Sequence, residues 1–554
     1  MLSADRDFPK LNGNASYLAI KLYNKEKGIE LDHQYALIEI PTAVISRFFV
    51  LPEKGERKNI VLLDDVIRNC LKHVFAIFKY DFVEAYTIKL TLDAELDIED
   101  DVTSSLMENI SQSVKNRRKG DPVRFVHDEE MPKDLLDFLI AKVGMDNDDV
   151  VVAGGRYHNF KDYIAFPKVG GAHLRYRAMP PLDHPKLKGK VGIFDVIKKQ
   201  DVLISYPYQS YDYVIHLMRE AAIDPAVSSI KITIYRVVDK NSKIMHSLIN
   251  AARNGKSVTV VVELKARFDE ETNMMYAHKL QDEGIKVIFG APGLKVHAKV
   301  LVIKRKEDGK SVRYVHIGTG NYHESNAKLY SDHSLLTCRE EIADEANKVF
   351  KFFKDNYKRY QFRHLIVAPF NARQQYYKLI NKEIKNAQAG KEAYIIIKVN
   401  SLHDKEMTTR LYKASMAGVK IKIIARSINS VISGEKGYSE NIEAVSVVDR
   451  LLEHARILVF ANGGDEKVYM GSSDWMGRNL DGRIEIMTPI FDPEIKATLL
   501  KVLNFQLTDN TKARFWNKKL SNPYQKTKGG DVRAQYDIYN YFKDQLKDNE
   551  QLES

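Results

Sequence analysis

The sequence contains almost no cysteine and no long apolar run, and both absences restrict the class of protein. Cys70 and Cys338 are the only cysteines among 554 residues. They are far apart, which argues against a disulfide framework or a zinc site and fits a reducing compartment. No apolar run approaches the roughly 20 residues of a membrane span. Asp5, Arg6 and Lys10 are charged where a signal peptide would be apolar, so we expect a cytoplasmic protein.

Length and charge set two further limits. A chain of 554 residues is too long for one hydrophobic core, and about three or four domains are expected. The net charge of +11 favours anionic partners such as nucleic acid, acidic lipid or phosphorylated small molecules. This charge also leaves peripheral contact with the inner face of a membrane open.

The first part of the chain mixes strand-like and helix-like patterns. Residues 35–41 and 86–92 alternate in the manner of strands, whereas residues 62–78 have a helical pattern. A proline-rich connection at residues 178–190 then marks a boundary. We therefore predict an α+β head domain over residues 1–183.

The remainder alternates apolar strands with helices, and it does so twice. The strand pattern of residues 230–237 returns at 393–399, and the helix and strand of 243–264 return at 407–426. Apolar strands that alternate with helices predict a layered α/β fold. The repeat predicts two similar domains, over residues 184–364 and 365–554.

Each repeat contains a histidine followed two residues later by a cation, at the start of an apolar run. The pairs are His297 with Lys299 in "KVHAKVLVIK" and His454 with Arg456 in "LEHARILVF". If each run is one strand, the two side chains of a pair share a face. The polar turns "GTGN" and "GSSDW" follow the pairs, and such turns can offer backbone N–H groups to an anion.

These residue types suit the transfer of a phosphoryl group. A histidine with an ordinary pKa near 6.5 is largely neutral at pH 7 and can attack phosphorus. Phosphoryl transfer depends mainly on positioning and on charge stabilisation, which cations and backbone donors supply. A lone histidine on an apolar strand is usually structural, but two in repeated contexts favour a catalytic role.

The paired motifs resemble the phospholipase D superfamily. The aspartate which that pattern places after the lysine is replaced here by Lys304 and Ala461. A closer resemblance is to the first family of polyphosphate kinases, carried by "VTVVVELKARFDEE", "APGLKVHAKVLVI", "YVHIGTGNYHE" and "VYMGSSDWMGRNLDGRIE". It covers nearly the whole chain. It implies two tandem phospholipase D-like α/β domains preceded by an α+β head domain.

The resemblance also implies a reaction and its residues. The enzyme would move the terminal phosphate of ATP onto polyphosphate, reversibly, with His297 phosphorylated and His454 as acid–base partner. Tyr330, Arg426 and His454 would surround the nucleotide. The anion site would be completed by Lys299, Arg456, Asn321 and Arg478.

Magnesium is the implied cofactor, and the family associates it with the positions of Arg236 and Arg267. Because a guanidinium has no lone pair for a metal, we expect these arginines to bind phosphate oxygens that share the ion. Asp269, Glu270 and Glu271 lie beside Arg267 and are weaker candidates for holding magnesium.

The resemblance includes one departure and leaves two alternatives. Family members usually begin with a helical domain that is not recognisable here, which puts ATP affinity and subunit assembly in question. The expected partners are ATP, ADP and polyphosphate, with nucleic acid not a main partner and a homo-oligomer, dimer or tetramer, as the expected assembly. The alternatives are a phospholipase D-like phosphodiesterase or nuclease and a non-catalytic polyanion-binding protein.

Overall fold

The computed structural model divides the chain into two compact units, Met1–Tyr176 and Arg177–Ser554. No helix among the residues described is long and apolar enough to cross a bilayer. The structure describes the whole chain except residues 3–7, 14, 28, 54, 56, 93–121, 146–149, 190–191, 238–240, 265, 267–269, 527–529 and 554.

The first unit is built on a five-stranded sheet and confirms the predicted α+β character. In spatial order the strands are β2 (Ile29–Glu39), β1 (Tyr17–Glu26), β5 (Phe82–Leu92), β6 (Pro122–Asp128) and β7 (Val150–Gly154). A short hairpin, β3 (Phe48–Val50) and β4 (Ile60–Leu62), completes the described strands of this unit.

Strand β1 is apolar on both faces because a helix covers each of them. Leu18 and Ile20 pack with residues of α1 (Leu63–Val74), whereas Tyr17 and Ala19 pack with residues of α3 (Lys133–Val143). Alternate residues of a strand point to opposite faces, so the run "YLAIKLY" supplies two cores at once.

The second unit contains two sheets of closely similar order. The first runs β11 (Lys286–Ile288), β10 (Ser257–Val262), β9 (Val227–Ile234), β13 (Lys299–Glu307), β14 (Lys310–Gly318) and β15 (Tyr330–Thr337), with β8 (Val202–Tyr206) also paired to β15. The second runs β19 (Ile442–Val447), β18 (Lys420–Ala425), β17 (Tyr394–Val399), β21 (Arg456–Phe460), β22 (Lys467–Gly471) and β23 (Arg483–Ile490), flanked by β24 (Ala513–Phe515) and β16 (Ile366–Ala368).

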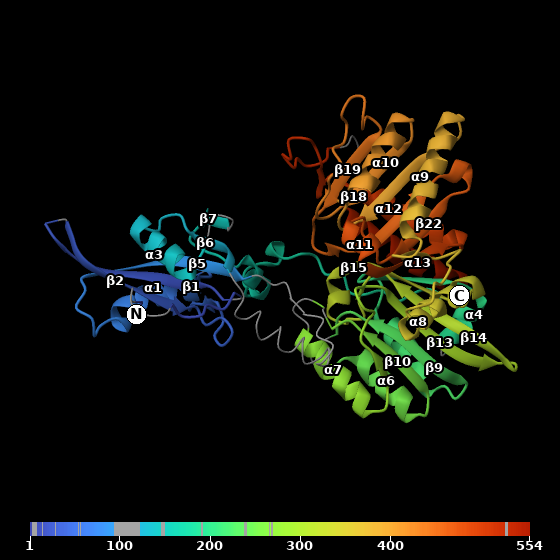
Figure 1. The fold of residues 1–554 in the computed structure, drawn as a ribbon, viewed down its shortest axis with the longest axis horizontal. Helices are drawn as coiled ribbons and strands as arrows, with labels where there is room; N and C mark the ends of the chain where they lie inside the picture. The colour runs from blue at the N-terminus through green and yellow to red at the C-terminus, as the bar shows by residue number, and fades with distance from the viewer. Residues whose placement is uncertain are drawn as a thin grey trace. The chain divides into compact units, whose positions relative to one another are not determined.

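Helices cover both sheets, as Figure 1 shows for α6 and α7 on the green half and α9 and α10 on the orange half. The first half carries α4 (Ile193–Lys199), α5 (Asp212–Ile223), α6 (Lys243–Arg253), α7 (Glu270–Asp282) and α8 (Glu340–Lys354). The second half carries α9 (Ala372–Gln388), α10 (Lys405–Met416), α11 (Gly477–Asp481), α12 (Pro493–Thr508) and α13 (Ala534–Glu553).

One hydrophobic core joins the two halves. Val302 of the first sheet and Phe350 of α8 belong to the same buried cluster as Val459 and Ile486 of the second sheet. Because each half buries apolar surface against the other, the two α/β halves form one body. The seam between them is therefore fixed by packing, and the histidines lie on it.

Candidate active site

The run containing His297 is not the single strand that the sequence predicted. It is interrupted at His297 and Ala298, whose backbone N–H groups both donate to the carbonyl of Ile484, at 3.0 and 2.8 Å. Before the break, β12 (Lys295–Val296) pairs with β23 of the second sheet, and after it β13 belongs to the first sheet. The chain thus crosses between the halves at His297.

The second repeat makes the same crossing in the opposite direction. The short strand β20 (Leu452–Glu453) pairs with β15 of the first sheet, and β21 continues in the second sheet. At the break, the N–H groups of His454 and Ala455 donate to the carbonyl of Ser331, at 3.1 and 3.0 Å. Each histidine therefore lies where its strand leaves one sheet for the other.

A carboxylate from the opposite half contacts each histidine. Nδ1 of His297 lies 2.9 Å from Oε2 of Glu485 on β23, and Nδ1 of His454 lies 2.9 Å from both carboxylate oxygens of Asp332 on β15. A carboxylate that accepts the Nδ1 proton leaves the lone pair on Nε2. Both rings are thereby oriented for chemistry at Nε2.

Sequence analysis missed these two carboxylates, although a signal was present. Asp332 and Glu485 are the only acidic residues of their strands, β15 and β23, and each follows the glycine of its turn, Gly318 or Gly471, by the same number of residues. A buried acid at matched positions of a repeat needs a partner, because an unpaired buried charge is costly.

The two polar turns support the carboxylates. The hydroxyl of Thr319 donates to Asp332 and that of Ser472 donates to Glu485, both at 2.5 Å. The backbone N–H groups of these two turn residues donate to sheet carbonyls at 2.9 Å, so these two are not the anion donors that we expected. Gly320 is required because a Cβ there would collide with the carboxylate of Asp332.

The two cations occupy equivalent places behind the histidines. Nζ of Lys299 donates to the backbone carbonyl of His297, and Nη1 of Arg456 donates to that of His454 at 2.6 Å. Nζ of Lys299 also lies 5.1 Å from the ring centroid of Tyr235, which itself meets the His297 ring edge-on at 4.9 Å. Both cations are buried.

The repeats differ in how their cations are balanced. The guanidinium of Arg456 pairs with Asp474 at 3.2 Å, and Asp474 also accepts the N–H of Asn400 at 2.8 Å. At the matching turn position the first repeat has the uncharged Asn321, whose buried Oδ1 has no hydrogen-bond partner among the described residues. The turn therefore supplies a carboxylate beside Arg456 but none beside Lys299. Burial lowers the pKa of Lys299 well below its ordinary value, against the opposing charge of Glu485.

Burial lowers the pKa of both histidines. Burial, together with Lys299 and Arg483, lowers the pKa of His297 well below its ordinary value, so the ring stays neutral at pH 7. Burial also lowers the pKa of His454, against the opposing charge of Asp332.

The partner carboxyls differ as well. Burial acts to raise the pKa of Asp332, but His454, Thr319 and Arg456 together hold it below its ordinary value. Burial raises the pKa of Glu485 above its ordinary value in spite of the nearby Lys299. His454 thus faces the more readily ionised carboxylate, which favours a role in proton transfer. His297, whose pKa lies well below its ordinary value, is suited to attack.

The structure brings most of the other predicted residues to the same seam. The ring of Tyr330 lies 5.2 Å from that of His454, and Nε of Arg426 donates to the side-chain oxygen of Asn400 at 3.1 Å. The half-buried Arg236 lies just after the end of β9, with its guanidinium 5.6 Å from the ring centroid of Tyr235. Exposed Arg478 lies on α11, next to Asn479, which donates to Glu485 at 2.7 Å. Arg267 and Asp269 lie outside the described residues.

The seam does not form a carboxylate cage for a metal ion in the described part of the chain. Asp332, Glu485 and Asp474 are each already bound to a histidine or arginine. Glu270 and Glu271 are the first two residues of α7. The described residues therefore do not fit a magnesium ion held by the protein alone.

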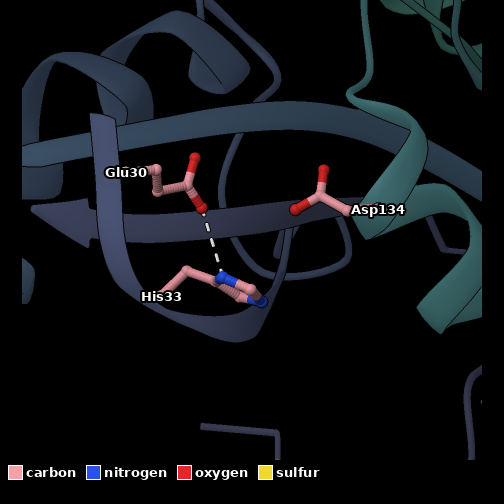
Figure 2. Close-up of side chains that lie close together, drawn as sticks. All are labelled: Glu30, His33 and Asp134. Carbon is pink, nitrogen blue, oxygen red and sulfur yellow. Dashed lines mark ion pairs between the residues drawn. The ribbon is translucent and has the colours of Figure 1, made fainter. Parts of the chain in front are cut away.

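The one described group with metal-ligand spacing lies in the first unit, and Figure 2 shows it as Glu30, His33 and Asp134. The ammonium of Lys21 contacts Glu30 at 3.0 Å and Asp134 at 2.6 Å. It therefore supplies the positive charge that a metal ion would otherwise bring to these carboxylates. The tyrosyl group of Tyr35 donates to Asp134 at 2.7 Å. This group ties β1, β2 and α3 together.

Neutral buried histidines make the stability of the fold depend on pH. Burial lowers the pKa of His316 to about 3, of His333 to about 3 and of His184 to about 4. The unfolded chain binds protons at these sites below about pH 6.5, whereas the folded chain does not. Stability is therefore complete above about pH 6.5 and falls toward pH 4, by about 1.4 kcal/mol per pH unit for each histidine.

We expect the urea midpoint to fall steeply between pH 6.5 and pH 4, and His333→Gln to have a shallower slope than the unmodified chain. The Nδ1 contact of His333 with Ser205, at 2.8 Å, gives the glutamine a nearby partner. Equal slopes for the two proteins would contradict the assignment of a neutral His333.

Comparison with known proteins assigns the family. Models of the polyphosphate kinase middle domain, C-terminal domain 1 and C-terminal domain 2 match residues 1–166, 192–359 and 365–535. The chain is 48% identical over 537 residues to a polyphosphate kinase of Vibrio vulnificus, covering 96% of this chain and 76% of the relative. It is 45% identical over 551 residues to the polyphosphate kinase of Escherichia coli K12, covering 98% of this chain and 79% of the relative.

A solved structure supports the same family assignment. The crystal structure of polyphosphate kinase from Porphyromonas gingivalis superposes with a TM-score of 0.85 at 34% identity, covering 99% of this chain and 80% of that chain. The match includes the head and both α/β halves, and with them the seam that carries the two histidines. The chain belongs to the polyphosphate kinase family and is an enzyme of the transferase class.

Proposed function

We propose that this enzyme transfers the terminal phosphate of ATP to inorganic polyphosphate, reversibly, through a phosphohistidine on His297. The observation that carries the proposal is the double crossing of the seam, which gives each histidine a carboxylate from the opposite repeat. The two histidines are also coupled electrostatically, because Arg456 acts on His297 and Lys299 acts on His454.

In the first step Nε2 of His297 attacks the terminal phosphorus of ATP. A P–N bond forms, the bond from that phosphorus to the bridging oxygen breaks, and the electron pair leaves with ADP. In the second step a terminal oxygen of polyphosphate attacks the same phosphorus, and the P–N electron pair returns to Nε2. Both the P–N bond and the phosphoanhydride transfer phosphate readily, so the reaction runs in both directions.

The remaining residues take supporting roles in this proposal. Glu485 holds the Nδ1 proton of His297, and His454, oriented by Asp332, acts as acid–base partner. The transferring group lies beside Lys299 and Asn321, where the turn carries no carboxylate. A phosphoryl group there favours the charged form of Lys299, which stabilises the developing negative charge. The nucleotide and its phosphates are bound by Tyr330, Arg426, Arg456 and Arg478.

Magnesium enters this proposal as part of the ATP complex. Bound to ATP, the ion would neutralise phosphate oxygens, and Arg236 and Arg267 would bind the same phosphates. This arrangement agrees with the lack of a carboxylate cage among the described residues. On the family resemblance alone, we further propose a homodimer or homotetramer. From the composition and the net charge of +11, we propose a place in the cytoplasm with peripheral contact at the inner face of the membrane.

Turnover in both directions tests the proposal. Incubation with ATP and magnesium should yield ADP and polyphosphate, and incubation with ADP and polyphosphate should yield ATP. Release of a mononucleotide or phosphatidate without any need for ATP would instead identify a phosphodiesterase. Salt-sensitive anion binding without turnover, unaffected by His297→Ala, would identify a non-catalytic protein.

A further inference from the structure

Five cations gather on the first half, away from the histidines. We call them the outer basic cluster: Lys231 on β9, Lys304 on β13, Arg313 on β14, and Lys351 and Lys354 on α8. Figure 1 shows α8 beside β13 and β14. Lys351 and Lys354 are exposed and the other three are half-buried.

The fold places these charges against one another. Lys304 and Arg313 are directly paired across two antiparallel strands, where like charges are destabilising. Lys231 pairs with Val302, two residues from Lys304, and therefore projects from the same face. The pKa of Lys231 is lowered first by burial and then by the charges of Arg313, Lys351, Lys304 and Lys354, as expected for mutual repulsion.

Little negative charge offsets the outer basic cluster. Among the described residues its ion pairing comes from Asp344, which lies 2.6 Å from Arg313. Nζ of Lys231 donates to the neutral side-chain oxygen of Asn347 at 2.9 Å. The outer basic cluster therefore has an excess of positive charge among the described residues.

The second repeat shows that the fold does not require these charges. Strand pairing aligns Val302 with Val459, Gly318 with Gly471, and α8 with α12. Under this alignment the five cations correspond to Ile396, Ala461, Glu466, Asn504 and Leu507. Not one of these is basic and one is acidic. The same architecture is stable without the cluster, so its charges serve something other than folding.

The cluster is separate from the active site. Lys304 lies five residues along β13 from Lys299, so the two side chains project from opposite faces of the strand. At about 3.3 Å per residue, this separates their backbones by about 17 Å. A phosphate on His297 cannot reach the cluster, but a polymer that ends at His297 can extend over such a distance.

We propose that the outer basic cluster is a second binding site for a linear polyphosphate chain, which holds the polymer while its end reacts at the seam; this rests on the proposed function. A chain held at two sites rebinds from a high effective concentration, so successive additions occur without release. Several cations along one face suit a repeating polyanion, whose release of counterions makes binding sensitive to salt.

The test uses Lys351→Glu/Lys354→Glu, which reverses two exposed charges on one helix. We expect the KM for long polyphosphate to rise about tenfold or more and the product chains to become shorter. The KM for ATP and the rate with tripolyphosphate should stay within about twofold. The matched control is Lys382→Glu/Lys385→Glu, which has the same spacing and charge change at exposed positions of α9.

Direct binding separates this proposal from the proposed function. Labelled long polyphosphate is titrated into His297→Ala with and without the α8 substitutions, over a range of salt concentrations. Weaker binding and a smaller salt dependence in the α8 variant would support the site even if no turnover occurs. Unchanged binding and unchanged product length would overturn it, as would loss of affinity only for single-stranded nucleic acid or for acidic lipid vesicles.

Discussion

His297→Ala is expected to lose the phosphoenzyme and to lower turnover by on the order of 10⁴-fold or more, as when a covalent nucleophile is removed. The neutral ring, with its Nδ1 contact to Glu485 at 2.9 Å, presents Nε2 as the nucleophile. The measurement is incubation with ATP labelled at its terminal phosphate, followed by a search for acid-labile and base-stable label on the protein.

The control for this experiment is His246→Ala, which removes an exposed histidine of α6 and should label normally. Circular dichroism and ATP binding establish that the His297→Ala variant is folded. Persistent labelling of folded His297→Ala, for example on His454, would remove the assigned nucleophile while leaving the family assignment intact.

Glu485→Gln is expected to slow labelling of His297 by about 10² to 10⁴-fold, the usual range for losing a group that fixes a reacting histidine. Oε1 of Glu485 accepts from Asn479 at 2.7 Å, and Oε2 accepts from Ser472 at 2.5 Å while facing His297. A glutamine must turn its NH₂ group toward one of these donors or toward the ring. If it faces Nδ1, the ring proton moves to Nε2 and blocks the attack.

The equivalent substitution in the other repeat, Asp332→Asn, provides the comparison. Asp332→Asn should lower turnover, because His454 loses the carboxylate that orients it. Phosphoenzyme should still accumulate, because His297 keeps its contact with Glu485. Rapid-mix labelling at several pH values separates the two variants, and ATP affinity should change little in either. Labelling of Glu485→Gln at the unmodified rate would show that the carboxylate is merely structural.

The sequence by itself determined the repeat, the α/β character and the chemistry-bearing pairs. Continuous apolar runs mark the strands of both halves, since a strand that is buried on two faces needs apolar residues at successive positions. The pairs His297–Lys299 and His454–Arg456 are visible because the residue types and their order recur in a fixed context. Local pattern was enough for these features because each depends on residues close together in the chain.

Only the tertiary structure decided how the halves meet. The apolar run around His297 predicted one strand, but pairing with β23 takes Lys295 and Val296 into the other sheet. That change of sheet depends on a remote strand, since His297 and its partner Glu485 are 188 residues apart in the chain. No periodicity in the run itself encodes this contact. The same holds for Asp332 and His454.

The difference between the repeats also became visible only in three dimensions. Asp474 and Asn321 occupy matching turn positions in the sequence, but the ion pair of Asp474 with Arg456 at 3.2 Å shows which cation is neutralised. Likewise, Lys231, Lys304 and Arg313 are scattered in the sequence and form one cluster through strand register. Charge balance is a property of distances, and distances between remote segments are set by packing.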